Sequence, residues 1–171
     1  MKAKIQHEIQ EYCSLLKLNA ICEHFEEAIK SATDYEGFLH QLLRMEVDAE
    51  EERAKERKIK AAKFPYRKYI EDLELDLLPE AMRKRLPELC SLDFIRESKN
   101  IIMTGNPGTG KTHTAIGLGI KACEQGYRVL YTTIPYLVTE LKESNSQQKL
   151  RSYQKRFEKY DLIIADELGY I

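Results

Sequence analysis

The sequence predicts an α/β fold with a parallel sheet, preceded by a small domain made only of helices. Three observations lead to this expectation. From residue 100 onward, short apolar runs alternate with stretches of helical periodicity, as they do in βαβ units. A glycine-rich stretch at 105–110 joins the first of these runs to a helix. Residues 1–63, in contrast, contain no proline and only one glycine, and their apolar side chains recur at helical spacing.

The N-terminal part is expected to form helices and to end at a linker. Its apolar spacing predicts helices over 3–16, 20–31 and 34–62, with Asn19 and Asp34 as N-caps. Pro65 ends the third helix, because proline lacks the N–H that a helix interior requires. We therefore place a helical domain at 1–65 and a second domain at 66–171.

The second domain should contain strands that alternate with helices. In chain order we expect short helices within 79–98, a strand at 101–104, a glycine-rich loop at 105–110, a helix at 111–126, a strand at 128–133, helices at 135–144 and 147–160, and a strand at 161–166. This alternation is typical of a parallel sheet, because parallel strands need crossover connections.

The stretch "GNPGTGKT" (105–112) matches the phosphate-binding motif G-x-x-x-x-G-K-[ST] in full, and a strand and a helix are expected on either side of it. Glycines allow φ angles that let successive N–H groups surround phosphate oxygens at a helix N-terminus. ATP and Mg²⁺ are therefore the expected cofactors, with Lys111 on the β- and γ-phosphates in a catalytic role and Thr112 on the metal. The expected cofactor-binding residues are Gly105, Asn106, Pro107, Gly108, Thr109, Gly110, Lys111, Thr112 and His113.

His113 allows two interpretations. It could act as a sensor or proton carrier beside the phosphates. The favoured interpretation is a packing residue on the first turn of the helix.

Two adjacent carboxylates lie at the C-terminal end of the last predicted strand. Parallel sheets bind ligands at the carboxyl ends of their strands, so Asp166 is placed to hold Mg²⁺ in the Walker B role. Neighbouring strand residues point to opposite sides, so Glu167 should have a different task, that of the catalytic base that activates water. The alternative for Glu167 is a solvated residue at a strand end. A kinase needs no water-activating base, so the pair favours hydrolysis over phosphoryl transfer.

Residues 53–68 hold eight Lys and Arg against one Glu, with aromatic residues in or beside the run. Such a composition suits the backbone of nucleic acid, where counterion release drives binding. The equally weighted alternative is a solvated helix face that pairs with the acidic stretch 46–52. Candidate DNA contacts are Arg57, Lys58, Lys60, Lys63, Arg67 and Lys68. A second basic patch around Lys149 to Lys159 has the same two interpretations.

The composition of the 171 residues narrows the class of protein. Apolar residues make up 43%, enough for a folded core. The net charge of −1 gives no indication of what kind of partner the protein binds. The four cysteines form no C-x-x-C pair, which argues against zinc or a disulfide framework. No apolar run suits a signal peptide or a membrane span, so a soluble, cytoplasmic protein without membrane contact is expected.

Several stretches together resemble the IstB-like transposition helper ATPases, AAA+ proteins related to the bacterial replicative helicase loader. The similarity covers nearly the whole chain. It rests on "FLHQLLRMEV" (38–47), "RKIKAAKFP" (57–65), "NIIMTGNPGTGKTHTAIGLGIKAC" (100–123), "GYRVLYTT" (126–133) and "YDLIIADELGY" (160–170). The extensions "GKTH" and "DELGY" are more specific than generic Walker motifs.

The resemblance implies an AAA+ P-loop NTPase with a three-layer α/β sandwich, encoded by an insertion sequence. Such proteins assemble as ATP-dependent homo-oligomers on double-stranded DNA, select the target site and activate a partner transposase. It assigns Lys111 and Thr112 to the nucleotide and Mg²⁺, Asp166 to the metal and Glu167 to the base. In these NTPases a further strand separates the phosphate-loop strand from the Walker B strand, so we expect a sequence truncated before that strand, the sensors and the arginine finger.

Three other functions remain open from the sequence. A replicative helicase loader would share the ATPase core and differ in its partner. A small-molecule kinase would need an acceptor, and its hydrolysis would ignore DNA. A nucleotide-gated binding module would bind ATP with negligible turnover.

Overall fold

The computed structural model describes residues 2–143 and 147–169. Contacts divide the chain into two compact units, one up to Ala54 and one from Lys55 on. The sequence placed this division after residue 65. The structure groups the end of the third helix with the second unit, because Ile59 (5% exposed) and Ala62 (0%) belong to that unit's hydrophobic core.

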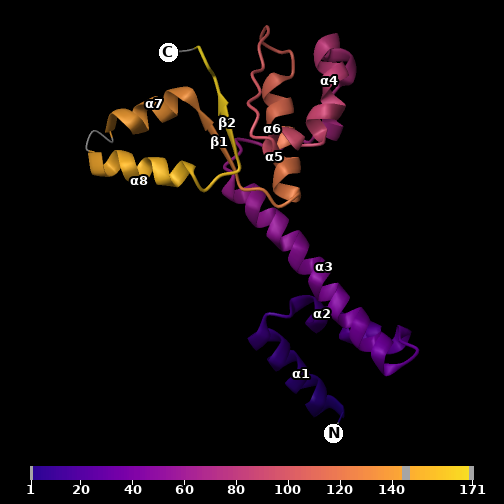
Figure 1. The fold of residues 1–171 in the computed structure, drawn as a ribbon. Coiled ribbons are helices and arrows are strands. Elements are labelled where there is room, and N and C mark those ends of the chain that lie inside the picture. The colour runs from indigo at the N-terminus through magenta and orange to yellow at the C-terminus, as the bar shows by residue number, and fades with distance from the viewer. Residues whose placement is uncertain (1, 144–146, 170–171) are drawn as a thin grey trace. The chain divides into compact units, whose positions relative to one another are not determined.

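The first unit contains α1 (Lys2–Leu16), α2 (Asn19–Ser31) and the first part of α3 (Tyr35–Ala61), as labelled in Figure 1. These bounds lie within one residue of the predicted ranges. Its core is formed by Phe25, Ala28 and Leu42. Asp34 caps α3 as expected, with Oδ1 accepting the Gly37 N–H at 2.6 Å. The N-cap of α2 is Leu18, so the prediction that Asn19 caps this helix was wrong.

Among its described residues, the second unit contains two parallel strands, β1 (Val129–Thr133) and β2 (Leu162–Asp166). Val129 lies opposite Leu162 and Thr133 lies opposite Asp166, so both strands end at the same edge. α6 (Lys111–Glu124) packs on both strands. α7 (Ile134–Glu143) and α8 (Gln147–Phe157) form the crossover between them and are drawn beside the strands in Figure 1.

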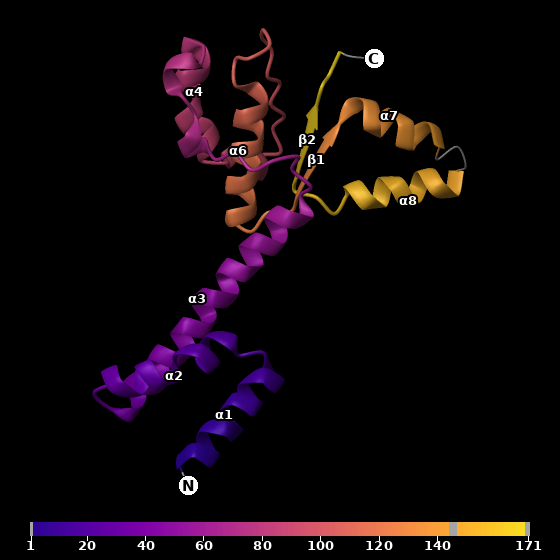
Figure 2. The same ribbon diagram turned by 180° about the vertical axis from the view of Figure 1, so that it is seen from behind.

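Short helices complete the second unit ahead of α6. They are the 3₁₀ turns η1 (Ile70–Asp72) and η2 (Leu75–Leu77), then α4 (Glu80–Cys90) and α5 (Asp93–Arg96). Figure 2 shows α4 beside α6, and the two helices are in contact. Their shared core includes Leu92, Ile116 and Ile120, each at most 1% exposed. Within residues 2–143 and 147–169, every helix is too short or too polar to cross a bilayer.

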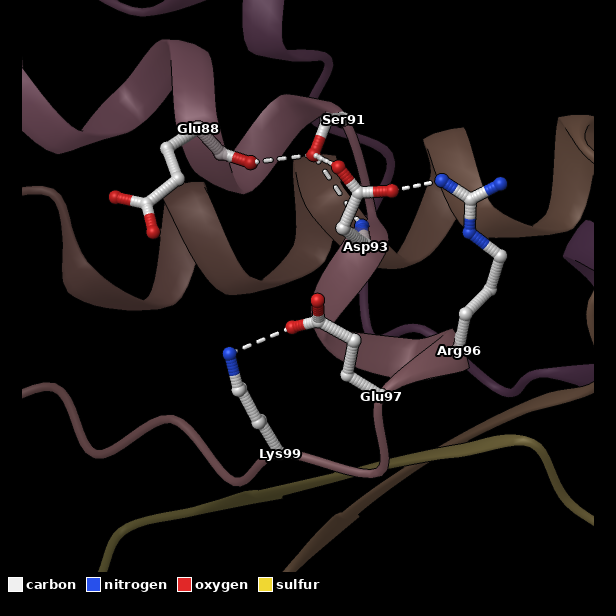
Figure 3. Close-up of polar contacts among 6 residues, drawn as sticks. All are labelled: Glu88, Ser91, Asp93, Arg96, Glu97 and Lys99. Atoms are coloured by element: carbon white, nitrogen blue, oxygen red, sulfur yellow. Dashed lines mark hydrogen bonds and ion pairs between the residues drawn. The ribbon is translucent and has the colours of Figure 1, made fainter.

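The junction of α4 and α5 holds Leu92 in this core. Leu92 has a φ of 61°, and the Ser91 hydroxyl lies 2.8 Å from both the Glu88 carbonyl and Asp93 Oδ2 (Figure 3). Arg96 pairs with Asp93 on the next turn, and Lys99 pairs with Glu97 at 2.7 Å. These exposed polar contacts stabilise the turn that leads into the segment before the glycine-rich loop.

The predicted strand at 101–104 is not formed, which corrects the sequence analysis. Ile101 and Met103 are half-buried against the core, whereas Ile102 is 80% exposed. A strand requires a hydrogen-bonded partner, and β1 and β2 pair with each other. A cavity of about 210 Å³, lined by Ile101, Met103 and the β2 residues, lies between this segment and β2.

Candidate nucleotide-binding site

The three glycines of the glycine-rich loop adopt backbone conformations that other residues rarely take. Gly105, Gly108 and Gly110 have φ angles of 147°, 80° and 75°. At Gly110 a side chain would also collide with Leu78, since an added Cβ would lie 2.8 Å from its Cδ2. α6 begins at Lys111, so the positive end of its helix dipole lies at the loop.

The side chain of Lys111 forms hydrogen bonds to the backbone of the loop. Its Nζ donates to the carbonyl oxygens of Gly105 at 2.8 Å and Asn106 at 2.7 Å. Thr109 Oγ1 donates to the same Asn106 carbonyl at 2.9 Å. The ammonium group is therefore held at the loop, where it could meet the negative charge of a bound phosphate.

Thr112 and Asp166 lie together although 54 positions separate them in the sequence. The Thr112 hydroxyl donates to Asp166 Oδ2 at 2.9 Å. Thr112 is on the first turn of α6 and Asp166 is the last residue of β2. Hydroxyl and carboxylate oxygens are the hard ligands that Mg²⁺ prefers, so this pair fits the metal that accompanies a nucleotide.

Glu167 lies just past the end of β2. Strand alternation was expected to direct Glu167 away from Asp166, but β2 ends at Asp166, as the predicted strand does, so alternation does not extend to Glu167. Glu167 has a φ of 62°, and its N–H donates to Asp166 Oδ1 at 2.9 Å. A left-handed conformation at a non-glycine residue costs about 1 kcal/mol or more and is often found at functional sites. Its exposed side chain lines the same cavity as Asp166.

One open cavity of about 940 Å³ brings most of the predicted residues together. The predicted residues that line it are Pro107, Gly108, Thr109, Gly110, Lys111, Thr112, His113, Asp166 and Glu167. Gly105 and Asn106 are not in its lining, although their carbonyls hold Lys111. A nucleoside triphosphate is the kind of ligand that fits a cavity with a phosphate loop and carboxylates on its walls.

His113 lies on the first turn of α6, in the wall of this cavity. It is half-buried, and its Nε2 lies 2.9 Å from the carbonyl oxygen of Tyr69. A carbonyl can only accept, so this contact places the proton on Nε2.

The cavity also has walls that the sequence analysis did not assign to it. Pro65 and Tyr66, from the linker after α3, line it, as does Tyr131 from β1. Tyr131 donates its hydroxyl hydrogen to Asp166 Oδ2 at 2.9 Å. No local pattern indicated Tyr131, because its contact with Asp166 depends on the register of β1 against β2.

The cations of the basic segment, residues 53–68, have different environments in the structure. Lys58 donates to the carbonyl of Gly126, and Arg67 forms two hydrogen bonds to Glu56 at 3.0 and 2.7 Å. Lys60, Lys63 and Lys68 are exposed, as is Arg57. The aromatic residues that suggested nucleic acid partly serve packing, because Phe64 and Tyr69 lie against the core. Of the second basic patch, the side chain of Lys149 lies outside the described residues, and Arg156 pairs with Glu140 at 3.3 Å.

Comparison with known proteins agrees with this geometry. Residues 13–171 match the family described as IstB-like ATP binding protein. A protein of Geobacillus stearothermophilus, named for ATP binding and for the insertion sequence IS5376, is 34% identical over 171 residues, covering 98% of this chain and 68% of the relative. A protein of Pseudomonas aeruginosa, named likewise for insertion sequence IS21, is 33% identical over 169 residues, covering 96% and 64%. The chain thus spans about two thirds of the length of these relatives.

Proposed function

Because the chain belongs to the IstB-like ATP-binding protein family, we propose that it is a Mg²⁺-dependent ATPase that acts in the transposition of an insertion sequence. The observation that carries the proposal is that the phosphate loop, Asp166 and Glu167 line a common cavity. A loop without the carboxylates would support nucleotide binding alone.

The chain's own residues have separable tasks in this proposal. The loop N–H groups and the Lys111 ammonium hold the phosphates and offset their charge. Thr112 and Asp166 hold Mg²⁺, which would withdraw electron density from the phosphates when bound. Glu167 orients a water molecule and accepts its proton. Hydrolysis is favoured over transfer to an acceptor, because a base in the cavity wall serves water as the nucleophile.

The larger architecture is also proposed. β1 and β2 would belong to a three-layer AAA+ sandwich, in which another strand lies between β2 and the segment 101–104. The cavity between them supports this arrangement. Residues 1–65 would then serve as a helical accessory domain ahead of the ATPase domain at 66–171, with its last residues, from Lys55 on, packed in the second unit.

Double-stranded DNA and a transposase are the proposed partners of a cytoplasmic homo-oligomer. The names of the relatives, which refer to insertion sequences, favour transposition over helicase loading. The exposed Lys60, Lys63 and Lys68 support contact with DNA phosphates.

Phosphate release from ATP tests the proposal, measured with and without Mg²⁺ and with and without double-stranded DNA. We expect phosphate release that depends on Mg²⁺ and whose rate changes when double-stranded DNA is added. Formation of ADP without free phosphate, which ignores DNA and requires a small acceptor, would identify a kinase instead. ATP binding without any turnover would leave a nucleotide-gated binding module.

A further inference from the structure

The hydroxyl group of Tyr131 lies against the carboxylate proposed to hold the metal. It donates to Asp166 Oδ2 at 2.9 Å, the same oxygen that accepts the Thr112 hydroxyl at 2.9 Å. The other oxygen, Oδ1, accepts the Glu167 N–H at 2.9 Å. Each carboxylate oxygen offers about two lone-pair sites. Oδ2 is therefore filled, and Oδ1 keeps room for one more partner.

The backbone and the ring of Tyr131 also have contacts within the protein. Its backbone N–H donates to the carbonyl of Ala62 at 2.8 Å. Its ring lies 6.3 Å from the ring of Phe64, with the two planes tilted by 58°. In β1 it lies opposite Ile164, two positions before Asp166 in the paired strand. The backbone and the ring of Tyr131 thus have contacts that do not depend on Asp166, and its hydroxyl favours one orientation of that carboxylate.

Neutral donors leave the negative charge of Asp166 available. A phenol is a neutral donor at neutral pH, because its ordinary pKa is about 10. A lysine in the same position would cancel the charge that attracts a cation. The phenol instead fixes the direction of the carboxylate without neutralising it.

We propose that Tyr131 is a positioning residue of the metal site, which orients Asp166 so that Oδ1 is directed to Mg²⁺ or to one of its water ligands. This inference rests on the proposed function and adds a residue to it. Outer residues that hold a metal ligand commonly affect metal affinity by about ten-fold or more when they are replaced.

Tyr131→Phe tests the inference, because phenylalanine keeps the ring beside Phe64 and the backbone bond to Ala62. The measurement is ATP affinity of the whole chain, by titration calorimetry, in Mg²⁺ and in EDTA. We expect the gain in affinity that Mg²⁺ produces to fall by about ten-fold. Affinity in EDTA and the midpoint of thermal unfolding should stay as in the wild type.

Tyr153→Phe is the matched control. Tyr153 also donates to a carboxylate, Glu140 Oε2 at 2.8 Å, but from α8 and outside the nucleotide cavity. Its loss should leave the Mg²⁺-dependent gain unchanged.

Two results would overturn the role of Tyr131. One is a wild-type Mg²⁺ gain in Tyr131→Phe, and the other is an equal loss of affinity in Mg²⁺ and in EDTA, which would indicate a role in the fold alone. If the wild-type chain binds no ATP at all, the proposed function fails first and the inference fails with it.

Discussion

The phosphate loop and the basic segment were both identified from short sequence patterns, and the structure treats them differently. In the loop, seven successive residues from Pro107 to His113 line one cavity with Asp166 and Glu167. In the basic segment, Lys58 and Arg67 are engaged within the protein, whereas Lys60, Lys63 and Lys68 are exposed. The pattern of the loop predicts that its residues share one site. The pattern of the basic segment describes only its charge, and does not predict what each cation contacts.

The difference follows from what each pattern encodes. Glycine spacing encodes backbone angles, and a phosphate site made of N–H groups depends mainly on those angles. A run of cations encodes charge, and the partner of each cation is chosen by the tertiary structure. Glu56 and the Gly126 carbonyl are partners that no local pattern could name.

Glu167→Gln should have the largest effect on the loop side of the comparison. It removes the proposed base and keeps the size of the side chain, so the rate of ATP hydrolysis should fall by about a thousand-fold. ATP affinity should change little, because the glutamine leaves the phosphate loop intact. Steady-state hydrolysis and equilibrium ATP binding measure the two quantities. Hydrolysis at the wild-type rate would remove Glu167 from the mechanism.

Lys111→Ala should weaken ATP binding by roughly a hundred-fold, because it deletes charge-assisted contacts to phosphate. Fluorescence titration with a labelled ATP analogue measures the loss. Lys142→Ala, an exposed lysine near the end of α7, is the control and should bind as the wild type does. Unchanged affinity in Lys111→Ala would contradict the assignment of the loop.

The basic segment can be divided by two sets of variants. Replacing Lys60, Lys63 and Lys68 together by alanine should weaken binding to double-stranded DNA by about ten-fold or more. The slope of log affinity against log salt should fall by about 0.9 for each phosphate contact that is lost. Lys58→Ala with Arg67→Ala should affect that slope less, since these cations have partners within the chain. An equal change in both sets would break the comparison.

Asp161→Asn should have the smallest effect of these variants. It tests whether Arg128, a cation outside both segments, is also held by a partner within the protein. Asp161 accepts the Arg128 backbone N–H at 2.7 Å and its guanidinium at 3.2 Å, where β1 and β2 begin. Hydrogen bonds from Arg128 lower the pKa of Asp161. Its stabilisation is therefore present above the unfolded pKa of about 4 and is lost as pH falls through the folded value.

The partly exposed pair should contribute about 1 kcal/mol at pH 7, after allowance for solvent screening. Denaturant unfolding of the wild type and Asp161→Asn measures it, and the difference should disappear in acid. A difference that persists at low pH would show that the carboxylate charge is not its cause.

The sequence predicted local features well and partner-dependent ones poorly. The helices and the glycine loop follow from periodicity and from backbone freedom, and both are carried by neighbouring residues. The prediction of a strand at 101–104 was wrong, because a strand needs a hydrogen-bonded partner that its own residues do not specify. The predicted strand at 161–166 ends at Asp166, as β2 does, but the left-handed conformation of Glu167 is not encoded by its residue type and was not predicted. Tyr131 was missed because its role depends on the register of two distant segments.

The central claim is that the glycine loop and the end of β2 form one Mg²⁺–ATP site. ATP affinity of the wild type and of Asp166→Asn, each in Mg²⁺ and in EDTA, tests this claim most directly. Mg²⁺ should tighten ATP binding in the wild type, and Asp166→Asn should lose most of that gain while its affinity in EDTA stays unchanged. A gain in Asp166→Asn equal to that of the wild type would contradict the claim.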